Sequence, residues 1–163
     1  MQKSVLQAVL SDQRALKQNE TYVQRQDVSV VEDDNVLVIS GIRRCGKSTL
    51  LQAIRENNEE QDYYINFDDE RLVHFTVDDF QQLLELFGER FGKQHTFYFD
   101  EIQNIPEWER FIRAMHDQGK NIILTGSNSS MLSKELGTKL TGRYKSIELF
   151  PFSYKEYLVY SDS

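Results

Sequence analysis

The 163-residue sequence contains one cysteine, Cys45, which excludes an internal disulfide and any zinc site built from several cysteines. No apolar run approaches the roughly 20 residues that a membrane-spanning helix requires. The first residues also lack the long apolar core of a secretion signal. We therefore expect a cytoplasmic location and no membrane partner.

The sequence also has fewer basic than acidic residues. The 19 Lys and Arg residues face 26 Asp and Glu residues, which gives a net charge of −7 at pH 7. This balance disfavours attraction of the whole surface to nucleic acid or to an anionic membrane. His74, His95 and His116 have no spacing typical of metal ligands, and we interpret them as structural. The Asn-Lys-x-Asp pattern that reads guanine is absent, which argues against a GTPase.

The sequence does contain a regular alternation of apolar strand-like runs and amphipathic helical segments. Strands are expected at 36–39, 63–67, 96–99, 121–124 and 146–149. Helices are expected at 1–19, from the end of the glycine-rich loop to about 57, from 76 to about 88, from 106 to near 119, at 130–136 and at 152–160. This alternation predicts a three-layer α/β domain with a mostly parallel sheet. We assign residues 36–163 to that core and residues 1–35 to an N-terminal helix and its connection.

Residues 41–48, Gly-Ile-Arg-Arg-Cys-Gly-Lys-Ser, match the phosphate-binding loop pattern and lie between a predicted strand and a predicted helix. The backbone N–H groups of such a loop and the N-terminus of the next helix bind the β- and γ-phosphates. We expect Lys47 to contact phosphate oxygens and Ser48 to hold Mg²⁺. The predicted nucleotide-binding residues are Gly41, Ile42, Arg43, Arg44, Cys45, Gly46, Lys47, Ser48 and Thr49.

Three side chains of that loop, Arg43, Arg44 and Cys45, have more than one possible role. Arg43 and Arg44 would contact phosphate or a partner, although side chains at these positions usually point outward. Cys45 is small enough to fit the loop, and we interpret it as structural rather than redox-active.

The predicted strand at 96–99 leads into two carboxylates, Asp100 and Glu101. Asp100, at the carboxyl end of the strand, would hold Mg²⁺ directly or through water. Glu101 would orient and deprotonate the attacking water. A hydrolase needs such a base, whereas a kinase acting on a hydroxyl has less need of it. The pair therefore favours a nucleoside-triphosphate hydrolase over a small-molecule or nucleotide kinase.

Three further polar residues are candidates for catalysis. The strand at 121–124 would lie between the two halves of the site, so Ser127 or Asn128 beyond its end would reach the γ-phosphate or the water. Alternatively, Ser127, Asn128 or Ser129 would cap the following helix. Arg143 would stabilise developing charge, either within its own chain or as an arginine finger in a neighbouring copy, or else it lies on the surface.

Several segments resemble a bacterial and archaeal group of AAA-type ATPases, the AAA_14-like proteins. The segments are 41–51, 64–72, 98–104, 124–132, 140–144 and 148–153. This resemblance implies the additional-strand, catalytic-glutamate class of P-loop ATPases, with a five-stranded sheet in the order 5-1-4-3-2. It also implies ATP as the nucleotide, and it implies the roles already given to Lys47, Ser48, Asp100 and Glu101.

Members of that group usually continue into a further C-terminal domain and commonly carry a winged-helix-like part that binds nucleic acid. Because this sequence ends at Ser163, the resemblance implies a fragment or short form of a longer ATPase. DNA or a protein partner would act through the missing parts, and a homo-oligomer would follow if Arg143 works between subunits. The leading hypothesis is a Mg²⁺-dependent ATPase. The alternative is a nucleotide-responsive interaction module with little turnover alone.

Overall fold

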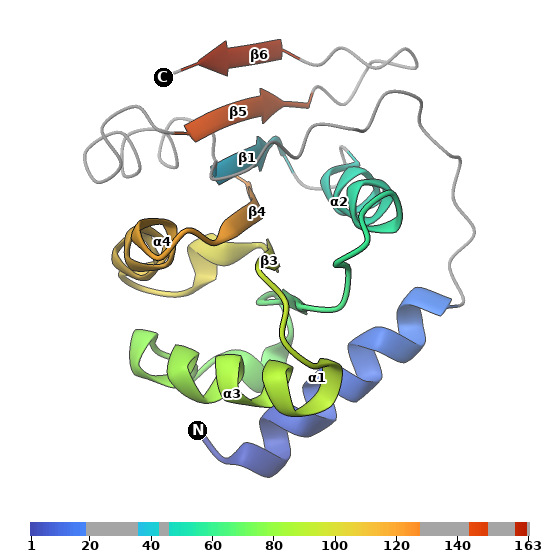
Figure 1. Ribbon diagram of the computed structural model, residues 1–163, viewed down its shortest axis with the longest axis vertical. Helices are drawn as coiled ribbons and strands as arrows, with labels where there is room; N and C mark the ends of the chain where they lie inside the picture. The colour runs from blue at the N-terminus through green and yellow to red at the C-terminus, as the bar shows by residue number, and fades with distance from the viewer. Residues whose placement is uncertain (19–35, 43–45, 128–143, 150–158, 163) are drawn as a thin grey trace.

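A six-stranded sheet with the order β2-β3-β4-β1-β5-β6 forms the centre of the molecule (Figure 1). The computed structural model describes residues 1–18, 36–42, 46–127, 144–149 and 159–162. The strands are β1 (Val36–Ser40), β2 (Tyr64–Asn66), β3 (Thr96–Asp100), β4 (Asn121–Gly126), β5 (Tyr144–Glu148) and β6 (Val159–Asp162). The first five are parallel to one another, and β6 pairs antiparallel with β5.

Helices cover both faces of this sheet. They are α1 (Lys3–Gln18), α2 (Lys47–Glu56), α3 (Phe80–Phe91) and α4 (Trp108–Asp117), with short 3-10 turns at Glu70–Leu72, Val77–Asp79 and Ile102–Asn104. Helix α2 lies on one face, and α3 and α4 lie on the other (Figure 1). Among the described residues, no helix combines the length and the apolar character needed to cross a membrane.

Each central strand contributes side chains to two separate cores. In β3, Phe97 and Phe99 pack in the core that contains α3 and α4, whereas Tyr98 packs in the core that contains α2. All five residues of β3 are buried. Burial on both faces is what a parallel sheet between two helical layers requires, and it explains why these strands read as almost continuous apolar runs.

The predicted strand order is confirmed, since the five parallel strands follow the order 5-1-4-3-2 when they are read from the opposite edge of the sheet. The predicted count of five strands misses β6. Most of the helix predicted at 152–160 lies outside the described part of the chain, because residues 150–158 are not described. Val159 and Tyr160 belong to β6, where they pair with Glu148 and Ile147, so the helix prediction is wrong at its end. Valine and tyrosine favour strands, and β5 offers an edge to pair with.

The end of α3 is a second difference. Gly88 was expected to end this helix, but the helix continues to Phe91 and is followed by Gly92, which has φ of 75°. A positive φ directly after a helix is a conformation that glycine adopts at least cost. Phe91 packs against the core formed with α1, so continuing the helix past Gly88 buries apolar surface. The helix predicted at 130–136 lies outside the described residues.

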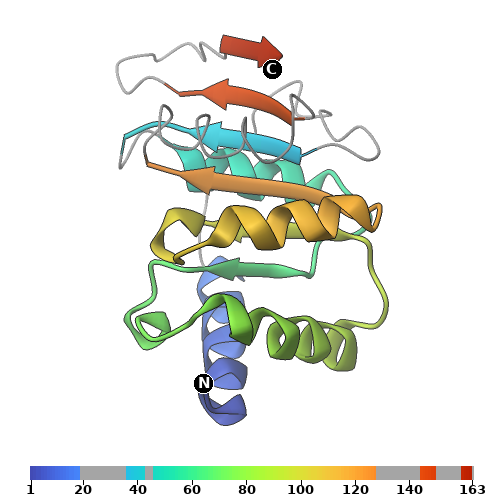
Figure 2. The same ribbon diagram turned by 90° about the vertical axis from the view of Figure 1, so that its left-hand side faces the viewer.

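Helix α1 crosses the sheet edge at β2 (Figure 2). Its buried residues on this side are Leu6, Val9 and Leu10. The Gln13 side chain bonds both backbone groups of Asn66, because its Nε2 donates to the carbonyl at 2.9 Å and its Oε1 accepts from the N–H at 2.9 Å. Beyond β2, Arg71 bridges Asp12 of α1 at 2.6 Å and Asp69 at 2.8 Å. Helix α1 is therefore fixed to the segment that follows β2.

Replacing Gln13 by Ala is expected to lower the free energy of unfolding by about 1–2 kcal/mol, because both backbone groups of Asn66 lose their partner. Urea denaturation measures the change. The control is Gln7→Ala, an exposed position on the same helix, where a change within about 0.5 kcal/mol is expected. Equal effects of the two substitutions would contradict a specific role for Gln13.

Candidate functional site

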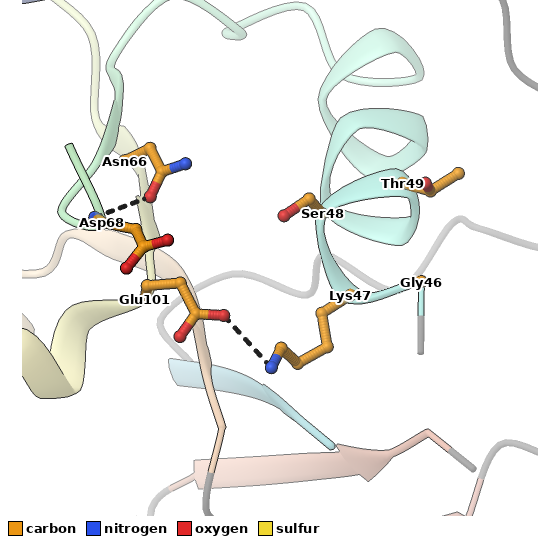
Figure 3. A pocket seen from close by; sticks show the side chains of 7 residues that line it. All are labelled: Gly46, Lys47, Ser48, Thr49, Asn66, Asp68 and Glu101. Carbon is orange, nitrogen blue, oxygen red and sulfur yellow. Dashed lines mark hydrogen bonds and ion pairs between the residues drawn. The ribbon is translucent and has the colours of Figure 1, made fainter. Parts of the chain in front are cut away.

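The carboxyl ends of β1, β3 and β4 meet at one edge of the sheet, the usual place for a ligand site in an open α/β fold. A pocket of about 430 Å³ lies there (Figure 3). Its lining residues are Gly46, Lys47, Ser48, Thr49, Asn66, Asp68 and Glu101. In Figure 3, Lys47 and Ser48 approach from the N-terminus of α2, and Glu101 faces them from the end of β3.

The loop between β1 and α2 is shaped for a phosphate at its α2 end. Gly46 has φ of 96° and immediately precedes α2. A side chain would strain this left-handed backbone, so glycine is required by the geometry of the turn. The free N–H groups of the first helical turn make this end of α2 attractive to anions.

Lys47 is buried, with 4% of its surface exposed. Its ammonium group donates to the Gly41 carbonyl at 2.7 Å and to the Ser127 hydroxyl at 3.2 Å. It also lies 3.1 Å from a carboxylate oxygen of Glu101, the ion pair drawn in Figure 3. These three contacts connect Lys47 with the residues that directly follow β1, β3 and β4.

Glu101 is held from several directions. Its backbone is left-handed, with φ of 54° and ψ of 49°, and its N–H donates to the Thr125 hydroxyl at 2.9 Å. Its Oε2 accepts hydrogen bonds from Gln103 at 2.6 Å and from Ser127 at 2.8 Å. Burial works against ionisation, but these donors and Lys47 together hold the pKa of Glu101 below its ordinary value. The side chain is thus a carboxylate at neutral pH, the form that a proton acceptor requires.

Asp100 is completely buried. Its Oδ2 accepts hydrogen bonds from Ser48 and Tyr64, each at 2.9 Å, and its Oδ1 accepts one from Thr125 at 2.5 Å. Burial raises the pKa of Asp100, the neighbouring charge of Glu101 adds to this effect, and the three hydroxyl donors oppose it.

The residues at this point fit a magnesium ion. Mg²⁺ prefers oxygen ligands, and it is commonly held by one or two carboxylates together with substrate phosphates and water. Ser48 supplies a hydroxyl and Asp100 supplies a carboxylate, both beside the anion-attracting N-terminus of α2. Within the described ranges, no group of three or more His, Cys, Asp or Glu side chains could hold a metal.

The structure brings together five of the residues predicted from sequence: Lys47, Ser48, Asp100, Glu101 and Ser127. Gly46 and Thr49 line the same pocket. Gly41 contacts Lys47 through its carbonyl, whereas Ile42 is 59% exposed. The predicted residues that lie outside the described part of the chain are Arg43, Arg44, Cys45, Asn128 and Arg143.

The residues that support the two carboxylates are not among those predicted from the sequence. Thr125 bonds the backbone of Glu101 and the side chain of Asp100, and Tyr64 bonds Asp100. Asn66 and Asp68, at the end of β2, line the pocket. One signal was available for these last two, because β2 runs parallel to β3 and its polar carboxyl end must lie beside that of β3.

The sequence matches relatives along most of its length. A protein of Methanocaldococcus jannaschii named only as uncharacterized is 34% identical over 98% of this chain, which covers 36% of that protein. An uncharacterized protein of Haemophilus influenzae is 37% identical over 89% of this chain, which covers 38% of that protein. The chain thus spans little more than a third of the length of these curated relatives.

Among solved structures, C. elegans PCH-2 aligns with a TM-score of 0.43 and 15% identity, over 89% of this chain and 41% of that one. The profile of the AAA domain family AAA_14 matches residues 33–158. Since that match covers most of the chain, the protein belongs to the AAA_14 family of AAA-type, P-loop ATPase-like domains.

Proposed function

We propose that this protein binds ATP together with Mg²⁺ and hydrolyses it, as the nucleotide-binding module of a longer ATPase. One observation carries the proposal: two halves of a phosphate site, from distant parts of the chain, meet in one pocket. Ser48 lies 2.9 Å from the Asp100 carboxylate, and Lys47 lies 3.1 Å from the Glu101 carboxylate. Membership of the AAA_14 family supports the same assignment.

Each residue has a distinct task in this proposal. Lys47 and the N-terminus of α2 bind the phosphates of ATP. Ser48 and Asp100 hold Mg²⁺, which neutralises charge on the phosphate oxygens when it is bound. Glu101 takes the proton of the attacking water, and Ser127 hydrogen-bonds the γ-phosphate or that water. Asn128 and Arg143, both outside the described residues, keep their predicted catalytic roles within the proposal.

The second candidate, a nucleotide-responsive interaction module with little turnover alone, is favoured by the contacts of Glu101. Both of its carboxylate oxygens are engaged, one by Lys47 and the other by Gln103 and Ser127. A proton acceptor in this arrangement must first be released. Since the chain covers 36% and 38% of its relatives, the releasing contact would come from other parts of such a protein, from DNA, from a protein partner or from a second copy.

Calorimetric titration with ATP at saturating Mg²⁺ tests the proposal. Saturable binding to one site is expected, with a dissociation constant in the micromolar to millimolar range. Absence of saturable binding to folded protein would contradict it. Phosphate release with and without added DNA then separates the two candidates, because turnover of the chain alone supports the ATPase and stimulated turnover supports the partner-dependent module.

A further inference from the structure

We propose that Tyr64 is a positioning residue that fixes the orientation of the Asp100 carboxylate and thereby sets the affinity of the site for Mg²⁺. This inference rests on the proposed function. Its basis is the set of hydrogen bonds that Asp100 accepts in its buried position. One carboxylate oxygen accepts from Thr125 at 2.5 Å, and the other accepts from Ser48 and from Tyr64, each at 2.9 Å.

Tyr64 differs from Ser48 in what it would do when the metal is bound. The Ser48 hydroxyl is itself expected to hold Mg²⁺, so its bond to Asp100 is subject to change on metal binding. The Tyr64 phenol comes from the neighbouring strand and has no such task. Tyr64 donates to one oxygen of Asp100 and Thr125 donates to the other, and neither donor is expected to bind the metal. These two hydrogen bonds therefore restrict rotation of the carboxylate.

The strand register explains why a tyrosine can reach this position. In the parallel pair of β2 and β3, Tyr64 lies opposite Tyr98, and Asn66 lies opposite Asp100. Tyr64 is therefore two residues before the partner of Asp100, on the same face of the sheet. Side chains on a strand lean along its direction, so a long side chain spans this diagonal and a short one does not.

A buried arginine holds the Tyr64 ring. Arg55, near the end of α2, is 4% exposed, and its guanidinium lies 4.1 Å from the centre of the Tyr64 ring and 5.6 Å from that of Tyr98. It also donates two hydrogen bonds to the Gln61 carbonyl, at 3.1 Å and 2.8 Å. Burial lowers the pKa of Arg55 to about 10, so the group stays cationic at neutral pH and its attraction to the ring persists.

The two ends of α2 thus act on the same carboxylate. Its N-terminus presents Ser48 directly to Asp100, and its C-terminal turn presents Arg55 to the ring whose hydroxyl bonds Asp100. The position of the metal carboxylate is therefore tied to the helix that binds the phosphates. Tyr64, which belongs to β2, connects the two, because its ring contacts Arg55 of α2 and its hydroxyl bonds Asp100.

The test is Tyr64→Phe, which removes one hydroxyl and keeps the ring under Arg55. The measurement is the Mg²⁺ concentration that half-saturates the binding of a fluorescent ATP analogue, with the binding of the same analogue in EDTA as the second readout. Loss of one hydrogen bond to a charged group is expected to raise the Mg²⁺ midpoint about tenfold. Binding without Mg²⁺ is expected to stay within about twofold of the parent, a split that general destabilisation would not produce.

Tyr98→Phe is the matched control. Tyr98 is a buried tyrosine beside Arg55, whereas Tyr64 is half-buried. The Tyr98 hydroxyl donates to the Glu60 carbonyl and not to the site. Its Mg²⁺ midpoint is expected to match the parent. Arg55→Lys, which keeps the charge and removes the flat guanidinium, is expected to raise the midpoint roughly two- to fivefold.

Equal Mg²⁺ midpoints for Tyr64→Phe and the parent would overturn this inference while leaving the proposed function in place. The same holds if Tyr64→Phe weakens binding equally with and without Mg²⁺, or if Tyr98→Phe shifts the midpoint as much. Failure of the parent protein to bind the analogue under either condition would overturn the proposed function, and this inference with it.

Discussion

Replacing Glu101 by Gln is expected to leave ATP binding intact and to reduce phosphate release by a factor of about 100 or more. The amide has the shape of the carboxylate but cannot take a proton from water. The neighbouring Gln103 side chain can also accommodate the new amide. The Oε1 atom of Gln103 is buried without a hydrogen-bond partner in the described structure, so rotation of the Gln103 amide would offer an acceptor to the new NH₂ group.

Calorimetry for binding and a phosphate-release assay for turnover measure these two properties separately. Glu107→Gln is a matched control, because Glu107 also has left-handed backbone, with φ of 63°, directly before a helix. It does not line the pocket, and its substitution is expected to leave both properties unchanged. Undiminished hydrolysis by Glu101→Gln would refute the assignment of Glu101 as the base.

Replacing Lys47 by Met is expected to weaken ATP binding about 10- to 100-fold, because a hydrogen bond to a charged phosphate contributes about 1.5–3 kcal/mol. The substitution also removes the cation that lies 3.1 Å from Glu101. A carboxylate that keeps its charge in a largely buried position without that cation is expected to destabilise the free protein by about 1–3 kcal/mol.

The double variant Lys47→Met with Glu101→Gln separates these two effects. It is expected to regain the lost stability in urea denaturation, since the unpaired charge is gone, and to remain defective in ATP binding. Lys93→Met, at an exposed position, serves as the control for removal of a lysine charge. ATP binding by Lys47→Met at parental affinity would exclude Lys47 from the phosphate site.

The resemblance to AAA-type ATPases implied the strand order that the structure shows. The motifs in the sequence predicted the meeting of Lys47 and Ser48 with Asp100 and Glu101. A glycine-rich loop between a strand and a helix has few alternative geometries. An apolar strand that ends in two carboxylates places them at the carboxyl edge of a parallel sheet, which is the edge where that loop also lies. These signals are local in the chain. The structure places Lys47 in contact with Glu101 and Ser48 in contact with Asp100.

The supporting residues could not be found in this way. Tyr64 and Thr125 contact Asp100 because of the register between neighbouring strands, and register is a property of the assembled sheet. The extent of α3 has a similar origin, since Gly88 and Gly92 are both plausible ends and only the packing of Phe91 against the core decides between them. Strand β6 depends on the edge that β5 offers, which no local pattern reveals.

The contact between Gln13 and Asn66 limits how copies of this protein can associate. An open strand edge can capture an extended segment of another molecule through backbone hydrogen bonds. At β2 the outward backbone groups of Asn66 are already bonded by a single side chain, and α1 lies across the same border. Pairing of a foreign strand at Asn66 is therefore blocked. Within the described part of the chain the opposite border of the sheet is β6, where an assembly that lengthens the sheet would begin.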